Sequence, residues 1–569
     1  MFDVKTFRAQ FPIFQHAENA SLVYFDNAAT TQKPACVIEA ISDYYRRYNA
    51  NAHRSSHRLG RLCTELIEQT RKDLSRFVGA ASAQNIVFSR GATDAINTIA
   101  HGLASQINAG DEILLTRAEH HANLVPWQRL AQRSGATLVF LPSVNGQPDF
   151  NCLEQFITPK TRLFCCTAAS NVLGVVAPFE QIKNVLQSHH VLWLLDAAQL
   201  LAHGPVNVEQ MGCDFLVGSA HKFYGPTGIG FFYARTSALE LLQPSQFGGQ
   251  MVSAVSLESS EFQSGPLKFE AGTPPIAEIA GLQACLDFWQ QQDVAALNTY
   301  EQELLHCLMT ALKKISQVTV LSNAKNNIGI VSFTVSGLQS QELAIWLDEQ
   351  DIAVRAGYHC ATPLLTDAGI EDCLRVSLCA YNTVAEVDRL IECLIHAIEE
   401  LSGEVNVIDQ NDKSPNLLNS STHLLNSNPH YWQELTPIDL SDCQLEDLYQ
   451  KRDWQKRYKL LLQWSKVLPS QPTIRTQQHK VEGCEADTWL LCLERNGVCC
   501  LFIDSTANVV KGLAIVLLLH LQNKPKQTIL NWHIEAVFER LQLSRYLSES
   551  RVNGFNALWQ QIKRDIDKL

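Results

Sequence analysis

Between residue 20 and about residue 235, short apolar segments alternate with stretches of helical pattern. The segments have almost no polar interruption, as in LFCCTAAS at 163–170 and VLWLLDAA at 191–198. Strands that are apolar on both sides must be covered on both faces, which is typical of a mainly parallel sheet between helices. Similar strands are predicted at 85–90, 112–116 and 137–141. The first part of the chain is therefore predicted to be an α/β domain.

The rest of the chain divides by composition. From about 275 to 402 the pattern is helix, strand, helix, which indicates a smaller α+β unit. Residues 403–430 are rich in Asn, Ser, Asp and Pro without a period, as in a linker. We predict a large domain at about 20–260, a small domain from 1–19 and about 261–402, the linker, and a separate α+β domain at 431–569. That last part holds six of the ten tryptophans: Trp432, Trp454, Trp464, Trp489, Trp532 and Trp559.

Composition excludes several classes of function. A net charge of -12 over 569 residues argues against a nucleic-acid partner. The longest strongly apolar run, Leu513 to Leu521, is shorter than the roughly 20 residues that span a bilayer, and the first residues lack a signal-peptide pattern. The 17 cysteines form no CxxC pair and lie mostly in apolar runs. We therefore expect a cytoplasmic protein with no nucleic-acid or membrane partner and no metal site.

The stretch GSAHKFYGPTGIGFFY at 218–233 contains a lysine in an unusual place. Lys222 lies between small residues and the apolar Phe223, about 25 residues after a strand that ends in Asp196. The ordinary alternative is a solvated surface lysine. An enzyme that forms a Schiff base needs a desolvated lysine, since desolvation keeps part of the amine neutral and nucleophilic.

Two further features fit the same ligand. Asp196 ends a buried strand, where sites form, and a carboxylate there is costly unless it faces a cation such as a protonated pyridine nitrogen. The alternative for Asp196 is a helix N-cap. SRGATDAIN at 89–97 places a glycine, Thr93 and a helix start together, which is a phosphate cradle or an ordinary cap. With Lys222, these features predict bound pyridoxal 5'-phosphate (PLP).

Several motifs in order then resemble a known family. They are DNAAT (26–30), GAT (91–93), AEHHANLVPW (118–127), SNVLG (170–174), DAAQ (196–199) and EAGTP (270–274). Over about residues 1–402 the chain resembles the class V aminotransferase group. Within this group it is most similar to group II cysteine desulfurases, the cysteine sulfinate desulfinase and selenocysteine lyase type. The resemblance implies a PLP-dependent transferase of fold type I, with a large mainly parallel-sheet domain and a small α+β domain.

The resemblance also implies roles for individual residues. His120 would stack on the pyridine ring and assist proton transfer, while Asn171 and Gln199 would lie near the ring's 3-oxygen and the substrate. Thr273 would reach the phosphate of the partner subunit, which implies a homodimer. Asn27 and Arg375 would bind the substrate, Arg375 through a bidentate pair with its carboxylate. The phosphate would be held by Ala92, Thr93, Ser219 and His221.

RAGYHCATPLL at 355–365 places Cys360 on a loop, flanked by His359 and preceded by Arg355. Positive neighbours favour the thiolate form of a cysteine. The pattern resembles the desulfurase active-site loop. It implies that Lys222 removes the α-proton of L-cysteine, and that the Cys360 thiolate takes the sulfur as a persulfide and leaves L-alanine. A plain transaminase needs no such cysteine.

A second cysteine lies in the last domain, where 480–497 is predicted as strand, tight turn at Gly483-Cys484, and strand, and 501–521 as strand and helix. A bland turn cysteine is the ordinary alternative for Cys484. The GC motif resembles the SufE family of sulfur acceptors, in which that cysteine takes the persulfide. Here Glu485 and Asp487 follow it, which departs from the family's pattern, and both would favour the protonated thiol.

These features together predict a PLP-dependent cysteine desulfurase fused to its own SufE-like acceptor. Sulfur would pass from Cys360 to Cys484 and on to a downstream sulfur acceptor or cluster scaffold protein, for iron–sulfur cluster assembly or sulfur trafficking. Two alternatives stay open: a selenocysteine lyase or cysteine sulfinate desulfinase, and a C-terminal domain that only docks or regulates.

Overall fold

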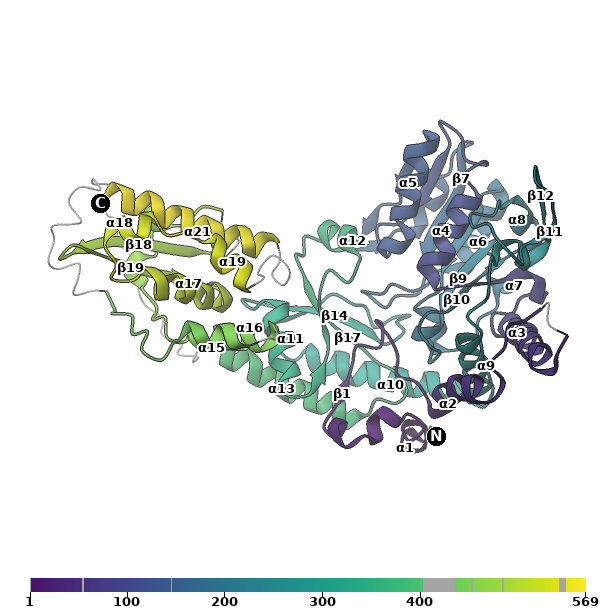
Figure 1. Cartoon of the computed structure of the whole chain (residues 1–569), viewed down its shortest axis with the longest axis horizontal. Coiled ribbons are helices and arrows are strands. Elements are labelled where there is room, and N and C mark those ends of the chain that lie inside the picture. The colour runs from purple at the N-terminus through teal and green to yellow at the C-terminus, as the bar shows by residue number, and fades with distance from the viewer. Residues whose placement is uncertain are drawn as a thin grey trace. The chain divides into compact units, whose positions relative to one another are not determined.

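In the computed structural model the chain divides into two compact units, Met1–Val405 and Asn406–Leu569. The structure describes residues 2–53, 56–144, 146–402, 435–451, 454–483, 486–541 and 549–569, and Figure 1 labels many of their helices and strands. The predicted linker at 403–430 lies outside these residues. Within them, no helix is both long and apolar enough to cross a membrane.

The first unit is built on a seven-stranded sheet of order β2-β10-β9-β8-β7-β3-β4. All neighbouring strands are parallel except at β10, which runs antiparallel to both β2 and β9. The mainly parallel sheet is thus confirmed, with one reversed strand. The strands are β2 (Ile86–Ser89), β3 (Glu112–Leu115), β4 (Thr137–Phe140), β7 (Thr161–Thr167), β8 (Leu192–Asp196), β9 (Phe215–Ser219) and β10 (Gly230–Ala234).

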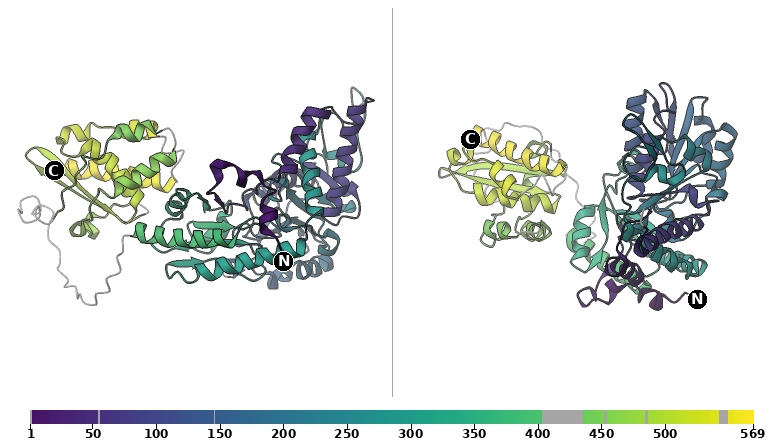
Figure 2. Two further views of the ribbon diagram at one scale, coloured as in Figure 1. Left: turned by 90° about the horizontal axis from the view of Figure 1, so that it is seen from below. Right: turned by 45° about the vertical axis from the view of Figure 1, so that its right-hand side comes forward.

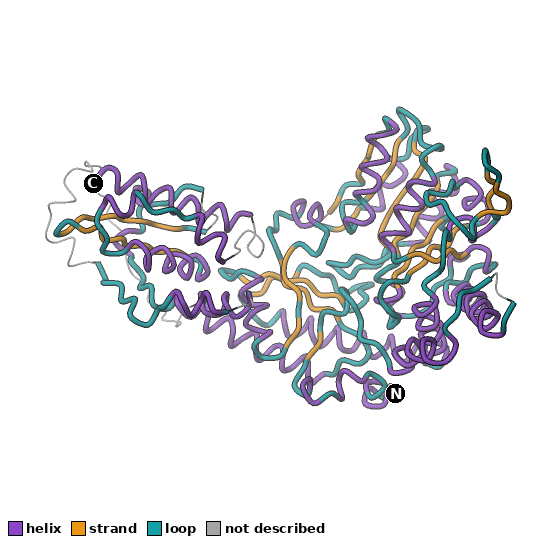
Figure 3. The backbone as a smooth tube through the Cα atoms, viewed as in Figure 1, coloured by secondary structure: helices purple, strands orange, loops and turns teal. Residues whose placement is uncertain are grey.

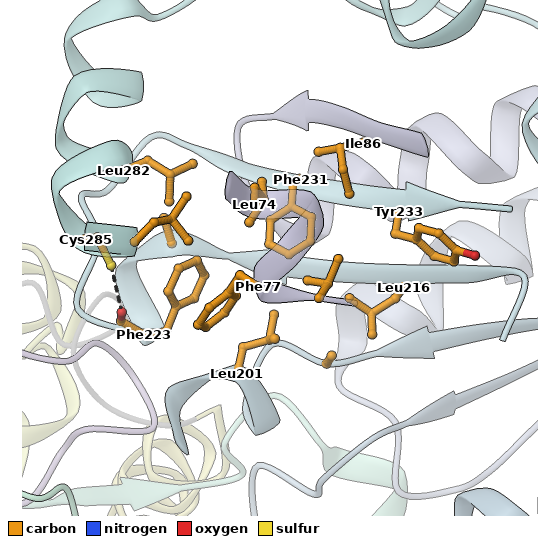
Figure 4. Close-up of a cluster of buried hydrophobic side chains, with 14 of the residues drawn as sticks. Leu74, Phe77, Ile86, Leu201, Leu216, Phe223, Phe231, Tyr233, Leu282 and Cys285 are labelled. Atoms are coloured by element: carbon orange, nitrogen blue, oxygen red, sulfur yellow. Dashed lines mark hydrogen bonds between the residues drawn. The ribbon is translucent and has the colours of Figure 1, made fainter. Parts of the chain in front are cut away.

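Helices cover both faces of this sheet, which explains its nearly continuous apolar strands. Successive residues of β7 enter different cores: Cys165 packs in a cluster with α4 (Ala92–Gly102) and α5 (Val125–Ser134), and Cys166 in one with α3 (Arg58–Phe77) and α9 (Ile276–Gln290). Figure 4 shows part of the second cluster, including the bond from Cys285 Sγ to the Phe223 carbonyl at 3.1 Å. The adjacent Cys165 and Cys166 are therefore both core residues.

Shorter elements complete the first unit. Other helices are α1 (Val4–Arg8), α2 (Ala35–Asp43), α6 (Phe179–His189), α7 (Val208–Met211) and α8 (Thr236–Leu241). Two small hairpins pair β5 (Ser143–Val144) with β6 (Gln147–Pro148) and β11 (Val252–Val255) with β12 (Ser260–Phe262). Near the N-terminus, β1 (Val23–Tyr24) pairs with β15 (Ile352–Ala353), so the start of the chain joins residues of the predicted small domain.

The small domain has its own four-stranded antiparallel sheet, of order β13-β14-β17-β16. Its strands, drawn in orange and apart from the large sheet in Figure 3, are β13 (Val318–Val320), β14 (Ile330–Val335), β16 (Arg355–Gly357) and β17 (Cys373–Ser377). The long helices α10 (Val294–Leu312) and α13 (Val384–Ser402) lie side by side (Figure 2, left). They pack with α11 (Ser340–Asp348) in one hydrophobic core.

Strand alternation in β17 places one polar residue on a functional face. Leu374 and Val376 belong to the hydrophobic core with α10 and α13. Because successive side chains point to opposite faces of a strand, Arg375 faces away from that core. It lines a cavity instead.

The second unit contains one antiparallel hairpin, β18 (Thr488–Arg495) with β19 (Val498–Ser505). The predicted strand before Gly483 is wrong: Lys480 forms only an isolated bridge to Trp489, and the hairpin turn lies at Asn496-Gly497. The predicted strand and helix over 501–521 are present. The helices are α15 (Leu445–Gln450), α16 (Trp454–Ser465), α17 (Asn508–Leu521), α18 (Lys526–Leu530), α19 (Glu535–Leu541) and α21 (Glu549–Lys568).

Helices α16 and α17 pack with almost no space at one glycine. A Cβ built at Gly512 would overlap the backbone carbonyl oxygen of Leu461 and lie 3.0 Å from its Cβ. Backbone cannot move aside as a flexible side chain can, so only glycine fits here.

We predict that Gly512→Ala destabilises the second unit. Overpacking of this kind costs about 1–3 kcal/mol, more than the helix propensity that alanine adds. Faster hydrogen exchange in α17 of the full-length chain would measure the loss. Gly249→Ala is the control, since its added methyl meets no atom within 4 Å. Equal exchange in both variants would contradict the prediction.

Candidate active site

A cavity of about 350 Å³ opens between the large sheet and the small domain. It receives the carboxyl ends of β7, β8 and β9, where sites form in such sheets. The small domain contributes Arg355, Arg375 and the loop of Cys360. The cavity brings together most of the predicted site residues: Ala92, Thr93, His120, Asn171, Asp196, Gln199, Ser219, His221, Lys222, Cys360 and Arg375.

Asp196 ends β8, and Lys222 follows the neighbouring strand β9. Asp196 is 5% exposed and its Oδ1 accepts a bond from the Ala198 amide at 3.0 Å. Burial raises the pKa of Asp196, against this bond and the Lys222 charge. Lys222 lies on the turn after β9, where burial lowers the pKa of its amine to about 8, although Asp196 opposes the change. The lysine is thus poised to be neutral and nucleophilic.

The start of α4 also lines the cavity. The Ala92 amide donates to Ser219 Oγ at 2.8 Å, which ties the helix start to the end of β9. A Cβ at Gly230 would lie 2.5 Å from the Gly91 Cα, so a glycine there lets β10 approach this turn. The helix N-terminus attracts anions.

The His120 ring stands neutral at the cavity wall. Its Nδ1 accepts a bond from the Ala122 amide at 3.0 Å, so the proton of the neutral ring lies on Nε2. Burial, and then the charge of Lys222, lower the pKa of His120 to about 4.

Behind His120 lies a buried carboxyl that sequence reasoning missed. Glu119 accepts bonds from Thr116 Oγ1 at 2.5 Å, the Thr167 amide at 3.1 Å and Asn123 Nδ2 at 2.6 Å. Burial raises the pKa of Glu119 to about 8. Its place beside His120 in the EHH motif was the only available signal.

The loop of Cys360 is held in strained backbone. His359 and Cys360 both have positive φ, 51° and 56°, which costs non-glycine residues about 1 kcal/mol each. Three bonds from residues of the large domain or the loop hold this conformation: Asn171 Nδ2 to the His359 carbonyl at 2.7 Å, the His121 amide to the Cys360 carbonyl at 2.8 Å, and the Thr362 amide to His121 Nε2 at 3.3 Å. Cys360 is exposed and lines the cavity.

Of the two neighbours expected to supply positive charge to Cys360, His359 is neutral and Arg355 is paired with a carboxylate. Burial lowers the pKa of His359 to about 3, and its Nε2 lies 3.0 Å from the Cys373 carbonyl, so the ring is neutral. Arg355 is charged but forms bonds of 2.8–3.1 Å with the Asp26 carboxylate. The prediction of positive neighbours that favour the Cys360 thiolate is therefore wrong: neither His359 nor Arg355 offers an unpaired cation.

Arg375 is nearly enclosed and only partly satisfied. It is 3% exposed, its Nη1 donates to the Asn171 carbonyl at 2.9 Å, and its Nη2 donates to Asp26 Oδ1 at 3.2 Å. Its Nε is buried and has no hydrogen-bond partner. A buried unpaired donor is costly, and an anion at that edge would satisfy it.

Two predicted residues, Asn27 and Thr273, do not line the cavity. The Asn27 side chain donates to the Ser377 carbonyl at 2.6 Å and accepts from the Tyr381 hydroxyl, away from the cavity lining. Thr273 is exposed and its Oγ1 lies 3.5 Å from Asn51 Nδ2. Cys484 is outside the described residues. Gln199, which does line the cavity, donates to the Ala28 carbonyl at 2.9 Å.

Described residues before and after Cys484 are joined by a backbone hydrogen bond and an ion pair. The Val481 amide donates to the Thr488 carbonyl at 2.8 Å, and Lys480 pairs with Asp487 at 2.5 Å. The Asp487 carbonyl also accepts the Thr506 amide at 2.9 Å. The carboxylate of Asp487, expected to act on Cys484, is thus neutralised by Lys480.

Comparison with known proteins agrees with this arrangement. Residues 23–390 match the aminotransferase class-V family, and residues 443–566 match the Fe-S metabolism associated (SufE) domain. A "probable cysteine desulfurase" of Pseudomonas putida is 42% identical over 402 residues, which is 70% of this chain and 100% of the relative.

Solved structures give the same result. The cysteine desulfurase CsdA of Escherichia coli is 36% identical with a TM-score of 0.66, over 70% of this chain and 99% of that one. A variant of C-DES, with glycine covalently linked to its PLP cofactor, is 26% identical with a TM-score of 0.60, over 68% and 98% of the chains. The predicted fold is confirmed. The chain belongs to the class-V aminotransferase family, and a SufE domain follows the family's fold at its C-terminal end.

Proposed function

We propose that this protein is a PLP-dependent cysteine desulfurase that passes sulfur to its own SufE domain. The observation that carries the proposal is the exposed Cys360, which lines the same cavity as the amine of Lys222. A carbonyl cofactor on the lysine and a thiol within one cavity suit the removal of sulfur from an amino acid. The desulfurase names of the relatives support the same chemistry.

The cavity suits PLP at two points besides Lys222. The helix N-terminus at Ala92 and Thr93, with Ser219 and His221 beside it, suits the phosphate. Asp196 suits the ring nitrogen, since a cation there would satisfy its buried carboxylate. The pyridine ring, when bound, supplies an electron sink for charge that develops at the substrate's α-carbon.

The chain's own residues then divide the work. Lys222 Nζ holds the cofactor and, once released, takes the α-proton of L-cysteine, for which a lowered pKa suits it. The neutral His120 ring offers its Nε2 proton at the cavity wall. Asn171 and Gln199 line the cavity beside it, and Arg375 orients the substrate by its carboxylate.

Sulfur leaves the substrate by attack of the Cys360 thiolate. A bond forms between Cys360 Sγ and the substrate sulfur while the substrate's C–S bond breaks. The bonding electrons stay on the β-carbon, which gains a proton and becomes a methyl group. Lys222 returns the proton to the α-carbon, so the product is L-alanine, and Cys360 is left as a persulfide. We propose that this sulfur passes to Cys484 and then to a downstream acceptor or cluster scaffold protein, for iron–sulfur assembly or sulfur trafficking.

We further propose that the protein is a cytoplasmic homodimer. The β11–β12 hairpin region exposes Phe247, Val255 and Leu257 at 67%, 68% and 105%. An exposed apolar group of this kind suits burial against a second copy. Thr273, exposed in the segment that follows the hairpin, would then reach the partner's phosphate.

Persulfide mapping tests the proposed function. After brief exposure of the full-length protein to L-cysteine, mass spectrometry is expected to find one added sulfur atom on Cys360 and on Cys484. Cys360→Ser should carry none on either position, because the relay begins there, and Cys484→Ser should retain it on Cys360. Cys36→Ser is the control, since Cys36 is also exposed but lies outside the cavity.

Other outcomes separate the alternatives. Persulfide on Cys360 alone would make the SufE domain a docking or regulatory module. Persulfide on neither cysteine would refute the desulfurase, and faster turnover of selenocysteine or cysteine sulfinate than of L-cysteine would reassign the substrate.

The pH dependence of cofactor uptake tests the state of Lys222. With a pKa of about 8, about one amine in ten is neutral at pH 7, and this fraction rises with pH. The rate at which the cofactor-free protein takes up PLP, followed by absorbance, should therefore rise through about pH 8 and level off above it. Lys222→Ala should show no such rise. A midpoint near 10 would mean that the lysine is not desolvated.

A further inference from the structure

One carboxylate joins the two arginines of the cavity. Asp26 accepts bonds from Arg355 Nε and Nη2 and, at 3.2 Å, from Arg375 Nη2. Among the described residues, no other carboxylate forms an ion pair with either arginine. Asp26 lies just after β1, so a residue near the N-terminus pairs with one arginine of β16 and one of β17.

The two arginines depend on Asp26 to different degrees. The Arg355 side chain is 48% exposed, so water can solvate its charge. The Arg375 side chain is 3% exposed, and burial lowers the pKa of its guanidinium while Asp26 opposes that change. A cation so enclosed needs a counter-charge.

We propose that Asp26 is the resident counter-ion of Arg375, and that the substrate's α-carboxylate competes with it for this guanidinium. The inference rests on the proposed function, in which Arg375 binds that carboxylate. The Nη1 edge is taken by the Asn171 carbonyl, which leaves Nε, with no partner, and Nη2, bonded to Asp26. A carboxylate that pairs with Nε and Nη2 must share or displace the bond of Asp26.

Displacement does not strand Asp26. Its carboxylate keeps the bonds from Arg355 Nε and Nη2 when Arg375 turns to the substrate. Asp26 is thus a positioning residue: it keeps Arg375 charged and placed in the free enzyme and lowers its affinity for other carboxylates. Removal of Asp26 leaves a buried cation that an added anion or the substrate would neutralise.

Asp26→Asn in the full-length, cofactor-loaded protein tests this linkage. The variant should unfold at a lower temperature than wild type, and sodium acetate should restore it more than sodium chloride of equal ionic strength. The acetate concentration that gives half of the rise in unfolding temperature should be about tenfold lower than in wild type, because the competing carboxylate of Asp26 is gone. The KM for L-cysteine should fall at least about threefold, with a smaller change in kcat.

Asp367→Asn is the matched control. Asp367 is the last residue of α12 (Thr362–Asp367), the helix that follows the Cys360 loop. It pairs with Arg117, whose side chain is 47% exposed. Exposed pairs contribute little, so this variant should show the same acetate response as wild type. Asp26→Asn with the acetate response of wild type, or with a raised KM, would overturn the proposal.

The double variant Asp26→Asn/Arg375→Met covers the case in which Asp26→Asn does not fold. Removal of both charges should recover the unfolding temperature and abolish the acetate effect, because no buried cation remains. A double variant no more stable than Asp26→Asn would overturn the proposal. The acetate measurement needs no turnover, so it stands or fails separately from desulfurase activity in wild type.

Discussion

The burial of Lys222 and Asp196 at the strand ends is the constraint on which the rest of the site depends. Burial lowers the pKa of the lysine and raises that of the carboxyl, so both groups are driven toward their neutral forms. The sheet provides this environment, since helices cover both its faces and leave the strand ends as the place where polar groups can meet. A cationic ring would favour the charged form of Asp196, and the neutral fraction of the Lys222 amine would be free to bind a carbonyl group.

The conformation of the Cys360 loop in the small domain depends on hydrogen bonds from the large domain. Backbone strain at His359 and Cys360 persists because Asn171 and His121, from the large domain, hold the loop's carbonyl groups. These bonds run from the large domain to the loop of the small domain, so the conformation that places Cys360 in the cavity is supported by contacts between the two domains.

Much of this was predictable from the sequence. The apolar strands, the aspartate that ends β8 and the lysine that follows β9 each carry a local signal of period, length or neighbouring residues. The need for glycine at position 230 is different: it comes from the fold, since Gly230 gives room to the backbone of Gly91, which is far away in the sequence. Most predicted cofactor residues line one cavity because parallel strands bring their carboxyl ends together.

The sequence by itself determined the strands, the order of the site residues along the chain and the nature of their chemistry, because these follow from local patterns. Only the tertiary structure decided the partners. Asp26 lies far in sequence from Arg355 and Arg375, Glu119 accepts a bond from Thr167 at the end of β7, and Asn27 is bonded to Ser377 and Tyr381. Charge compensation and burial depend on which distant groups meet in space. The state of Arg355 and His359 therefore became visible only in the fold.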